Sequence, residues 1–240
     1  MNFKIFCLNN ILQEKIQSHI DFYAKSWYNI SMKTLLYMDY NNTIEDIVLK
    51  KRGNKFFQAL NRLASLSEKL DIVMITKAGD NIDDDILELL YFMPLHLRQM
   101  VKGIVKNGGQ SYTNFWYEQD GFPRFGDKVE LGGKTKREGI ELSKPIVDPE
   151  NECELLICAG DNVQDDLPMI DANVKAKKYL IMANERKNLP HIENMIKTTK
   201  HSYGVASAIM KICDKLEDIS QQNDENIEKI CQNDENIEKF

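Results

Sequence analysis

Short apolar runs that end in polar residues recur along the chain from residue 34 onward. They lie at 34–38, 71–76, 103–106, 154–159 and 178–184. Apolar runs without polar alternation are typical of strands that are buried on both faces of a parallel sheet. The pattern therefore predicts a mostly parallel sheet that contains these five segments.

Between these runs, apolar residues recur at the spacing of amphipathic helices. One predicted helix carries on one face Phe56, Phe57, Leu60, Leu63, Leu66 and Leu70. The other predicted helices lie near 80–93, at 136–143, after 165 and around 209–212. Strands that alternate with helices predict an α/β fold.

The α/β pattern covers 34–215, which we interpret as one core domain. Residues 1–33 are an accessory segment with apolar residues at helical spacing, which predicts a helix that either covers the sheet or faces a partner. Residues 216–240 carry an acidic repeat in which 222–230 is nearly duplicated at 232–240. Because this tail has few apolar residues to bury, we expect it to be disordered or marginally helical.

The segment 110–135 separates the third predicted strand from the helix that begins at Lys136. Asp120-Gly121 is a hairpin signal, and the segment can hold little more than a β-hairpin. Its aromatic residues either form a recognition surface or pack the hairpin on the sheet. A basic cluster at 50–52 either meets an anionic substrate or forms a solvated turn.

Polar residues that could take part in catalysis or ligand binding follow the predicted strands. Asp39 follows the first strand, Thr76 ends the second and Asp161 follows the fourth. Ligands of open α/β sheets bind at the carboxyl ends of the strands, so these side chains are expected to line one site. The acidic pair 165–166 lies in the same loop as Asp161, and Lys136 begins a helix.

In chain order, this set resembles the four motifs of the haloacid dehalogenase superfamily, whose members are mostly Mg²⁺-dependent phosphatases. The resemblance is closest to the sugar-phosphatase (Cof-type) members and spans about 34–215. It implies a Rossmann-like three-layer α/β/α sandwich in which a small β-hairpin stands in place of a cap domain.

The resemblance also implies catalytic roles. Asp39 corresponds to the nucleophile that forms an aspartyl-phosphate, and Thr76 and Lys136 correspond to groups that hold the phosphoryl oxygens. Lys134 competes with Lys136 for this role. The neighbouring residues predicted to contact substrate are Thr43, Lys77 and Asn162.

Mg²⁺ is the implied cofactor, and it requires hard oxygen ligands. The resemblance assigns to it the carboxylates of Asp39, Asp161 and Asp165 and the backbone carbonyl of Asn41. Asp166 is the alternative to Asp165.

The family pattern is Asp-x-Asp-x-Thr, and Asn41 stands where the second Asp normally serves as general acid and base. Asn forms hydrogen bonds but cannot pass a proton, and general acid–base catalysis contributes about 10²–10⁴-fold. Two functions follow: a slow or specialised phosphatase that prefers aryl phosphates, or a phosphatase-like protein that binds Mg²⁺ and a phosphorylated partner without turnover. Phosphoryl transfer to an acceptor other than water is a weaker third choice.

Composition is that of an ordinary soluble globular protein, with 42% hydrophobic and 28% charged residues among 240. The net charge of −6 argues against a mainly electrostatic nucleic-acid binder, and no apolar stretch is long enough to span a membrane. Five scattered cysteines without a Cys-x-x-Cys pair indicate reduced thiols and a cytoplasmic protein. Without a cap, we expect a large phosphorylated substrate, or an oligomer in which a neighbouring subunit acts as the lid.

Overall fold

The computed structural model of the chain describes residues 32–51, 53–79, 82–106, 111–117, 123–184 and 189–237. Residues 32–216 form one compact unit, and the described residues from 217 onward belong to a second. The helix expected within 1–33 and the Asp120-Gly121 turn lie outside the described residues. Within the described ranges, no helix is both long and apolar enough to cross a membrane.

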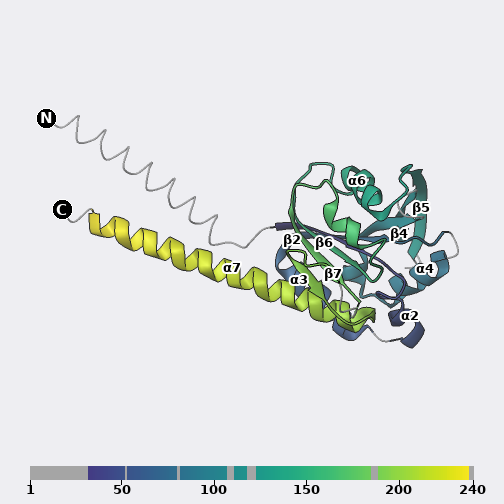
Figure 1. Cartoon of the computed structure of the whole chain (residues 1–240), viewed down its shortest axis with the longest axis horizontal. Helices are drawn as coiled ribbons and strands as arrows, with labels where there is room; N and C mark the ends of the chain where they lie inside the picture. The colour runs from purple at the N-terminus through teal and green to yellow at the C-terminus, as the bar shows by residue number, and fades with distance from the viewer. Residues whose placement is uncertain are drawn as a thin grey trace. The chain divides into compact units, whose positions relative to one another are not determined.

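One eight-stranded sheet forms the centre of the core unit (Figure 1). Its strands are β1 (Met32–Met38), β2 (Ser67–Ile75), β3 (Val101–Lys106), β4 (Ser111–Tyr117), β5 (Pro123–Glu130), β6 (Cys153–Gly160), β7 (Lys177–Met182) and β8 (Met195–Lys197). The strand order is β5-β4-β3-β2-β1-β6-β7-β8. All pairs from β3 to β8 are parallel, which confirms a mostly parallel sheet that includes the five predicted strands. The short β8 was not predicted.

The insert at 110–135 forms the predicted hairpin from β4 and β5. Its first strand pairs antiparallel with β3, with Ile104 opposite Thr113. The hairpin therefore extends the main sheet at one edge.

The helices are α2 (Asp46–Lys50), α3 (Asn54–Ser65), α4 (Asp83–Phe92), α5 (Leu95–Arg98), α6 (Lys136–Val147), the 3-10 helix η2 (Leu167–Asp171) and α7 (His201–Ile237). The prediction that the helix at 56 continues to Leu70 is wrong, because β2 begins at Ser67 and buries Leu70 in the sheet. Of the two expectations for the tail, the helical one agrees with α7, which continues to Ile237.

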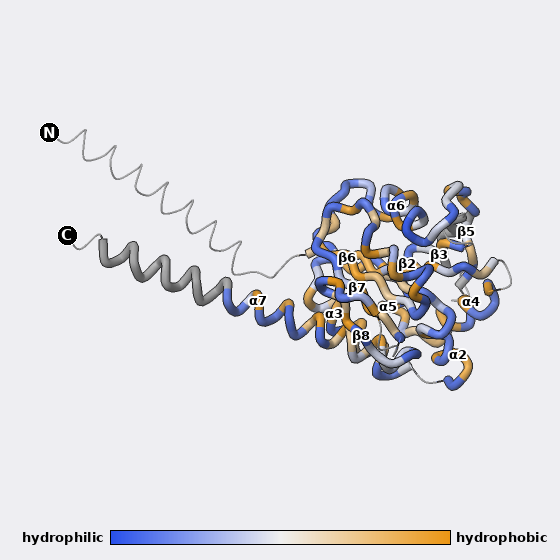
Figure 2. Tube along the Cα trace, in the orientation of Figure 1, coloured by the Kyte–Doolittle hydropathy of each residue, from blue (hydrophilic) through white to orange (hydrophobic). Residues whose placement is uncertain are grey.

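Helices cover both faces of the sheet, so the predicted three-layer α/β/α arrangement is confirmed. One apolar core packs α2, α3, α4, α5 and the start of α7 against the sheet, and includes Phe56, Leu60, Ile86, Leu97 and Ile209. The other packs α6 and η2 against the opposite face, and includes Ile140, Val147, Met169 and Ala172. In Figure 2 the strands inside the core unit are mainly apolar, as β6 and β7 show. Burial on both faces explains why these strands lack polar alternation.

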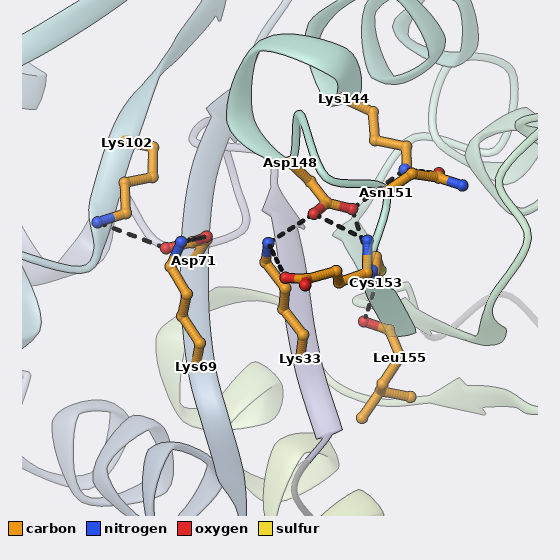
Figure 3. Close-up of polar contacts among 10 residues, drawn as sticks. Lys33, Lys69, Asp71, Lys102, Lys144, Asp148, Asn151, Cys153 and Leu155 are labelled. Atoms are coloured by element: carbon orange, nitrogen blue, oxygen red, sulfur yellow. Dashed lines mark hydrogen bonds and ion pairs between the residues drawn. The ribbon is translucent and has the colours of Figure 1, made fainter.

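A buried carboxylate ties α6 to the amino ends of the strands (Figure 3). Asp148 accepts from Lys33 of β1 at 2.6 Å and pairs with Lys144 at 3.1 Å. Its side chain also accepts from the backbone N–H groups of Glu152 and Cys153. Burial alone would raise the pKa of Asp148, but its hydrogen bonds with Lys33 and Lys144 outweigh burial and lower that pKa. Every partner thus favours the ionised form.

Candidate active site

Three strands bring their following residues to the same edge of the sheet. The chain order of the strands reverses at β1, which lies between β2 and β6. Met38 pairs with Met74 of β2 and with Ala159 of β6. Asp39, Thr76 and Asp161 therefore leave the sheet at nearly the same level. Such a switch point is where open α/β sheets bind ligands.

A cluster of three buried carboxylates lies at this edge. Asp39 is 4% exposed, Asp161 8% and Asp166 0%. Each offers an oxygen, and these three oxygens lie within 4.8 Å of one another. Buried carboxylates repel one another unless cations compensate their charge.

The structure places Asp166 in this cluster, which corrects the assignment of Asp165. Asp165 instead forms an ion pair with Lys77 and accepts from the side chain of Asn162 at 3.1 Å. The backbone N–H of Asp166 donates to the Asn162 carbonyl at 2.8 Å and closes a turn that directs the Asp166 side chain inward. The Asp166 carboxylate in turn accepts from the backbone N–H of Asn162 at 2.7 Å. Gly160 makes room for it, since a Cβ at Gly160 would lie 2.2 Å from Asp166 Cγ.

Lys136 bridges two of the three acids. Its Nζ lies 2.8 Å from Asp39 and 2.5 Å from Asp166. A capping box between Thr135 and Glu138 begins α6, so Lys136 occupies the first helical position and reaches back to the strand ends. The competing Lys134 is exposed, and its N–H donates to Glu138.

The acids and the lysine shift one another's protonation. Burial raises the pKa of Asp39 to about 7, helped by the charges of Asp166 and Asp161 and opposed by Lys136. Burial is also the main reason why the pKa of Asp166 is raised. Burial would lower the pKa of Lys136, but the charges of Asp39 and Asp166 outweigh burial and raise that pKa. The metal-free cluster thus binds protons that a cation could replace.

The cluster fits Mg²⁺, because it offers three hard carboxylate oxygens from two neighbouring strand ends in a buried position. Asp39, Asp161 and Asp166 would hold the ion, with the backbone carbonyl of Asn41 as the further ligand that the resemblance implies.

Mg²⁺ is expected to stabilise the protein much more at pH 8 than at pH 5.5. A carboxyl group with a raised folded pKa favours the folded state while it is protonated, so this contribution is lost as pH rises from about 4 through about 7. Above that range Asp39 is ionised, and the neighbouring acids disfavour its charge until a cation binds. Melting temperatures with Mg²⁺ and with EDTA at both pH values check this. An equal gain at both pH values would contradict it.

Exchange of Asp166 for Asn should weaken Mg²⁺ binding by at least about tenfold, because it removes one charged ligand of a small buried set. Asp165→Asn is the matched control, and we expect it to change the dissociation constant by less than about twofold. Calorimetric titration with MgCl₂ measures both. The reverse ranking would restore Asp165 as the ligand.

The remaining predicted residues lie in three different surroundings. Thr76 is fully buried and donates to the exposed Asn41 at 3.3 Å, so the two lie together beside Asp39. Thr43, predicted to contact substrate, is fully buried, and its Oγ1 has no hydrogen-bond partner among the described residues. The exposed Lys77 and Asn162 both contact Asp165, at the rim of the cluster.

Two contacts to Asp161 were not predicted from the sequence. Lys200 reaches its carboxylate at 3.2 Å, and Asn184 donates to its backbone carbonyl at 2.7 Å. Asn184 ends the predicted strand at 178–184, so its position at this edge could have signalled it. Lys200 follows β8, which was not predicted, so the sequence pattern gave no such signal for it.

One cavity adjoins the site, and a second lies at the basic cluster. The first, of about 450 Å³, is lined by Lys77, Lys136, Arg137 and Asp165, and so reaches the lysine that bridges the acids. The second, of about 500 Å³, is lined by Lys50 and Lys51 of the basic cluster, among other residues. Arg52 lies outside the described residues.

Two solved structures are similar to this chain. One is yhjK of Bacillus subtilis, described as a haloacid dehalogenase-like hydrolase protein, with 12% identity, a TM-score of 0.44, and coverage of 75% of this chain and 96% of its own. The other is a Thermoplasma acidophilum protein with 12% identity, a TM-score of 0.45, and coverage of 76% and 99%. No family model matches the chain, and no curated protein does. Likeness at these TM-scores is too low to support a conclusion, so the function proposed below rests on the chain's own geometry.

Proposed function

We propose that this protein is a Mg²⁺-dependent phosphatase of the haloacid dehalogenase type, with Asp39 as its nucleophile. The observation that supports this best is the buried cluster of Asp39, Asp161 and Asp166, bridged by Lys136, at the switch point of the sheet. A purely structural cluster would have little reason to bury three carboxylates with so few compensating cations, because each buried charge costs free energy.

The chain's residues divide the reaction between them. An oxygen of Asp39 forms a bond to phosphorus while the bond to the leaving oxygen breaks, and water then cleaves the aspartyl-phosphate. Lys136 offsets negative charge between Asp39 and the phosphoryl group, and Thr76 offers its hydroxyl to a phosphoryl oxygen. Bound Mg²⁺ supplies charge neutralisation for the transferring group.

Asn41 determines which substrates suit this site. It accepts from Thr76 but cannot protonate a leaving group. Aryl phosphates need the least protonation, because aryl oxides are good leaving groups. The open approach beside Lys136 and the hairpin built into the sheet leave room for a large phosphorylated substrate.

Exchange of Asn41 for Asp is expected to raise turnover of alkyl phosphates by about 10²-fold, and that of aryl phosphates by less, because it supplies the missing general acid. Phosphate release from both substrate classes with Mg²⁺ is the measurement. If the wild type and the variant both release no phosphate, the phosphatase proposal fails. The second candidate, which Asn41 favours, is then a protein that binds Mg²⁺ and a phosphorylated partner.

A further inference from the structure

Lys200 is the second cation of the acid cluster, and it differs from Lys136 in its surroundings. The side chain of Lys136 is 3% exposed and lies between two acids. That of Lys200 is 47% exposed, and its Nζ lies 3.2 Å from Oδ2 of Asp161. Lys136 is therefore fixed in the cluster, whereas the ammonium group of Lys200 can leave toward solvent at little cost.

The backbone around Lys200 is held in place. The Thr198 N–H donates to the Met182 carbonyl at 3.0 Å, and the His201 N–H donates to the Asn42 carbonyl at 3.0 Å. His201 has a φ of 72°, a conformation that costs free energy and that persists only where the surroundings impose it. A Cβ at Gly204 would lie 2.0 Å from the Thr199 carbonyl oxygen, so glycine lets α7 begin close against this loop.

These contacts connect Lys200 to both sides of the site. Thr198 joins the loop to the end of β7, and His201 joins it to the loop that follows Asp39. Unlike this backbone, the half-exposed side chain of Lys200 can move. It extends to the carboxylate of Asp161, which would bind Mg²⁺. A cation that pairs with a carboxylate which also binds a metal weakens metal binding, because both cannot neutralise the same carboxylate at full strength.

We propose that Lys200 is a built-in counter-cation, which neutralises Asp161 in the metal-free protein and competes with Mg²⁺ for that carboxylate. This inference rests on the proposed function, because it takes Asp161 as a metal ligand. Lys200 is then a positioning residue: it keeps the cluster assembled before the metal arrives and sets a lower metal affinity than the three acids alone would give.

Calorimetric titration of the full chain with MgCl₂ tests this role. Lys200→Met should bind Mg²⁺ about two- to tenfold more tightly than the wild type. This change in affinity corresponds to the free energy that a partly exposed ion pair contributes. Lys200→Arg keeps the charge and should stay within about twofold of the wild type. Lys211→Met, which removes an exposed lysine of α7, is the matched control and should leave the affinity unchanged.

Thermal unfolding in EDTA gives a second readout. Without metal, Lys200→Met should melt below Lys211→Met, because Asp161 loses its counter-charge. Equal or weaker Mg²⁺ binding by Lys200→Met, or an undiminished melting temperature in EDTA, would overturn the counter-cation role and leave the proposed function intact. No Mg²⁺ binding by the wild type or any variant would contradict the proposed function itself, and the inference with it.

Discussion

Replacement of Asp39 by Asn is expected to lower aryl-phosphate turnover by at least about 10³-fold while the protein stays folded. The amide keeps the shape of the carboxylate but is no nucleophile, and loss of a nucleophile removes the covalent route. Hydrolysis of an aryl phosphate with saturating Mg²⁺ measures the loss. Burial and the charges of Asp166 and Asp161 disfavour ionised Asp39, so the neutral amide should not lower the melting temperature of the metal-free protein.

Asp218→Asn is the matched control for this substitution, since it makes the same chemical change at an exposed position of α7. Its turnover should equal that of the wild type. Full turnover by Asp39→Asn would exclude Asp39 as nucleophile. Loss of turnover together with a lower melting temperature would indicate that Asp39 is needed for the fold instead.

Truncation of Asp148 to Ala is expected to cost about 3–5 kcal/mol of the free energy of unfolding. The substitution removes the buried carboxylate that pairs with both Lys33 and Lys144, and leaves the Cys153 N–H without its acceptor (Figure 3). Denaturant unfolding at pH 7 measures the difference. Glu152→Ala is the control, because Glu152 is 64% exposed and lies 3.4 Å from Lys33. We expect it to cost less than about 1 kcal/mol.

The cost of Asp148→Ala should also depend on pH. The folded pKa of Asp148 is lowered from its ordinary value of 3.8. Its stabilisation is therefore present above about pH 4 and is lost as pH falls from there toward the folded pKa. The difference between wild type and variant should shrink in that acid range. A difference of the same size at pH 3 and pH 7 would show that cavity formation, not charge, causes the loss.

The elements and the strand ends follow from local pattern, which is why they could be predicted. Strands buried on both faces leave continuous apolar runs, and the residue after such a run reaches the ligand edge, as Asp39 and Asp161 do. The pattern Thr135-x-x-Glu138 is a capping box in sequence and in structure. It fixes the start of α6 and places Lys136, rather than Lys134, at the acids.

Contacts made by tertiary packing could not be predicted in this way. Asp166 points inward, and the adjacent Asp165 does not. This choice depends on the turn between Asn162 and Asp166 and on the space at Gly160. Leu70 fits a helical face and a strand equally well in sequence, and the sheet decides between them. Lys33 and Asp148 are separated by 115 residues, so no local pattern links them.

Identification of the phosphorylated residue tests the central claim most directly. Wild-type protein is acid-quenched during turnover of an aryl phosphate with Mg²⁺, and its peptides are analysed by mass spectrometry. We predict a phosphoryl group on Asp39 that accumulates because Asn41 cannot activate water, and that is missing from Asp39→Asn and from samples in EDTA. Phosphate release without a phosphoryl group on Asp39, or with one on another residue, would contradict the account.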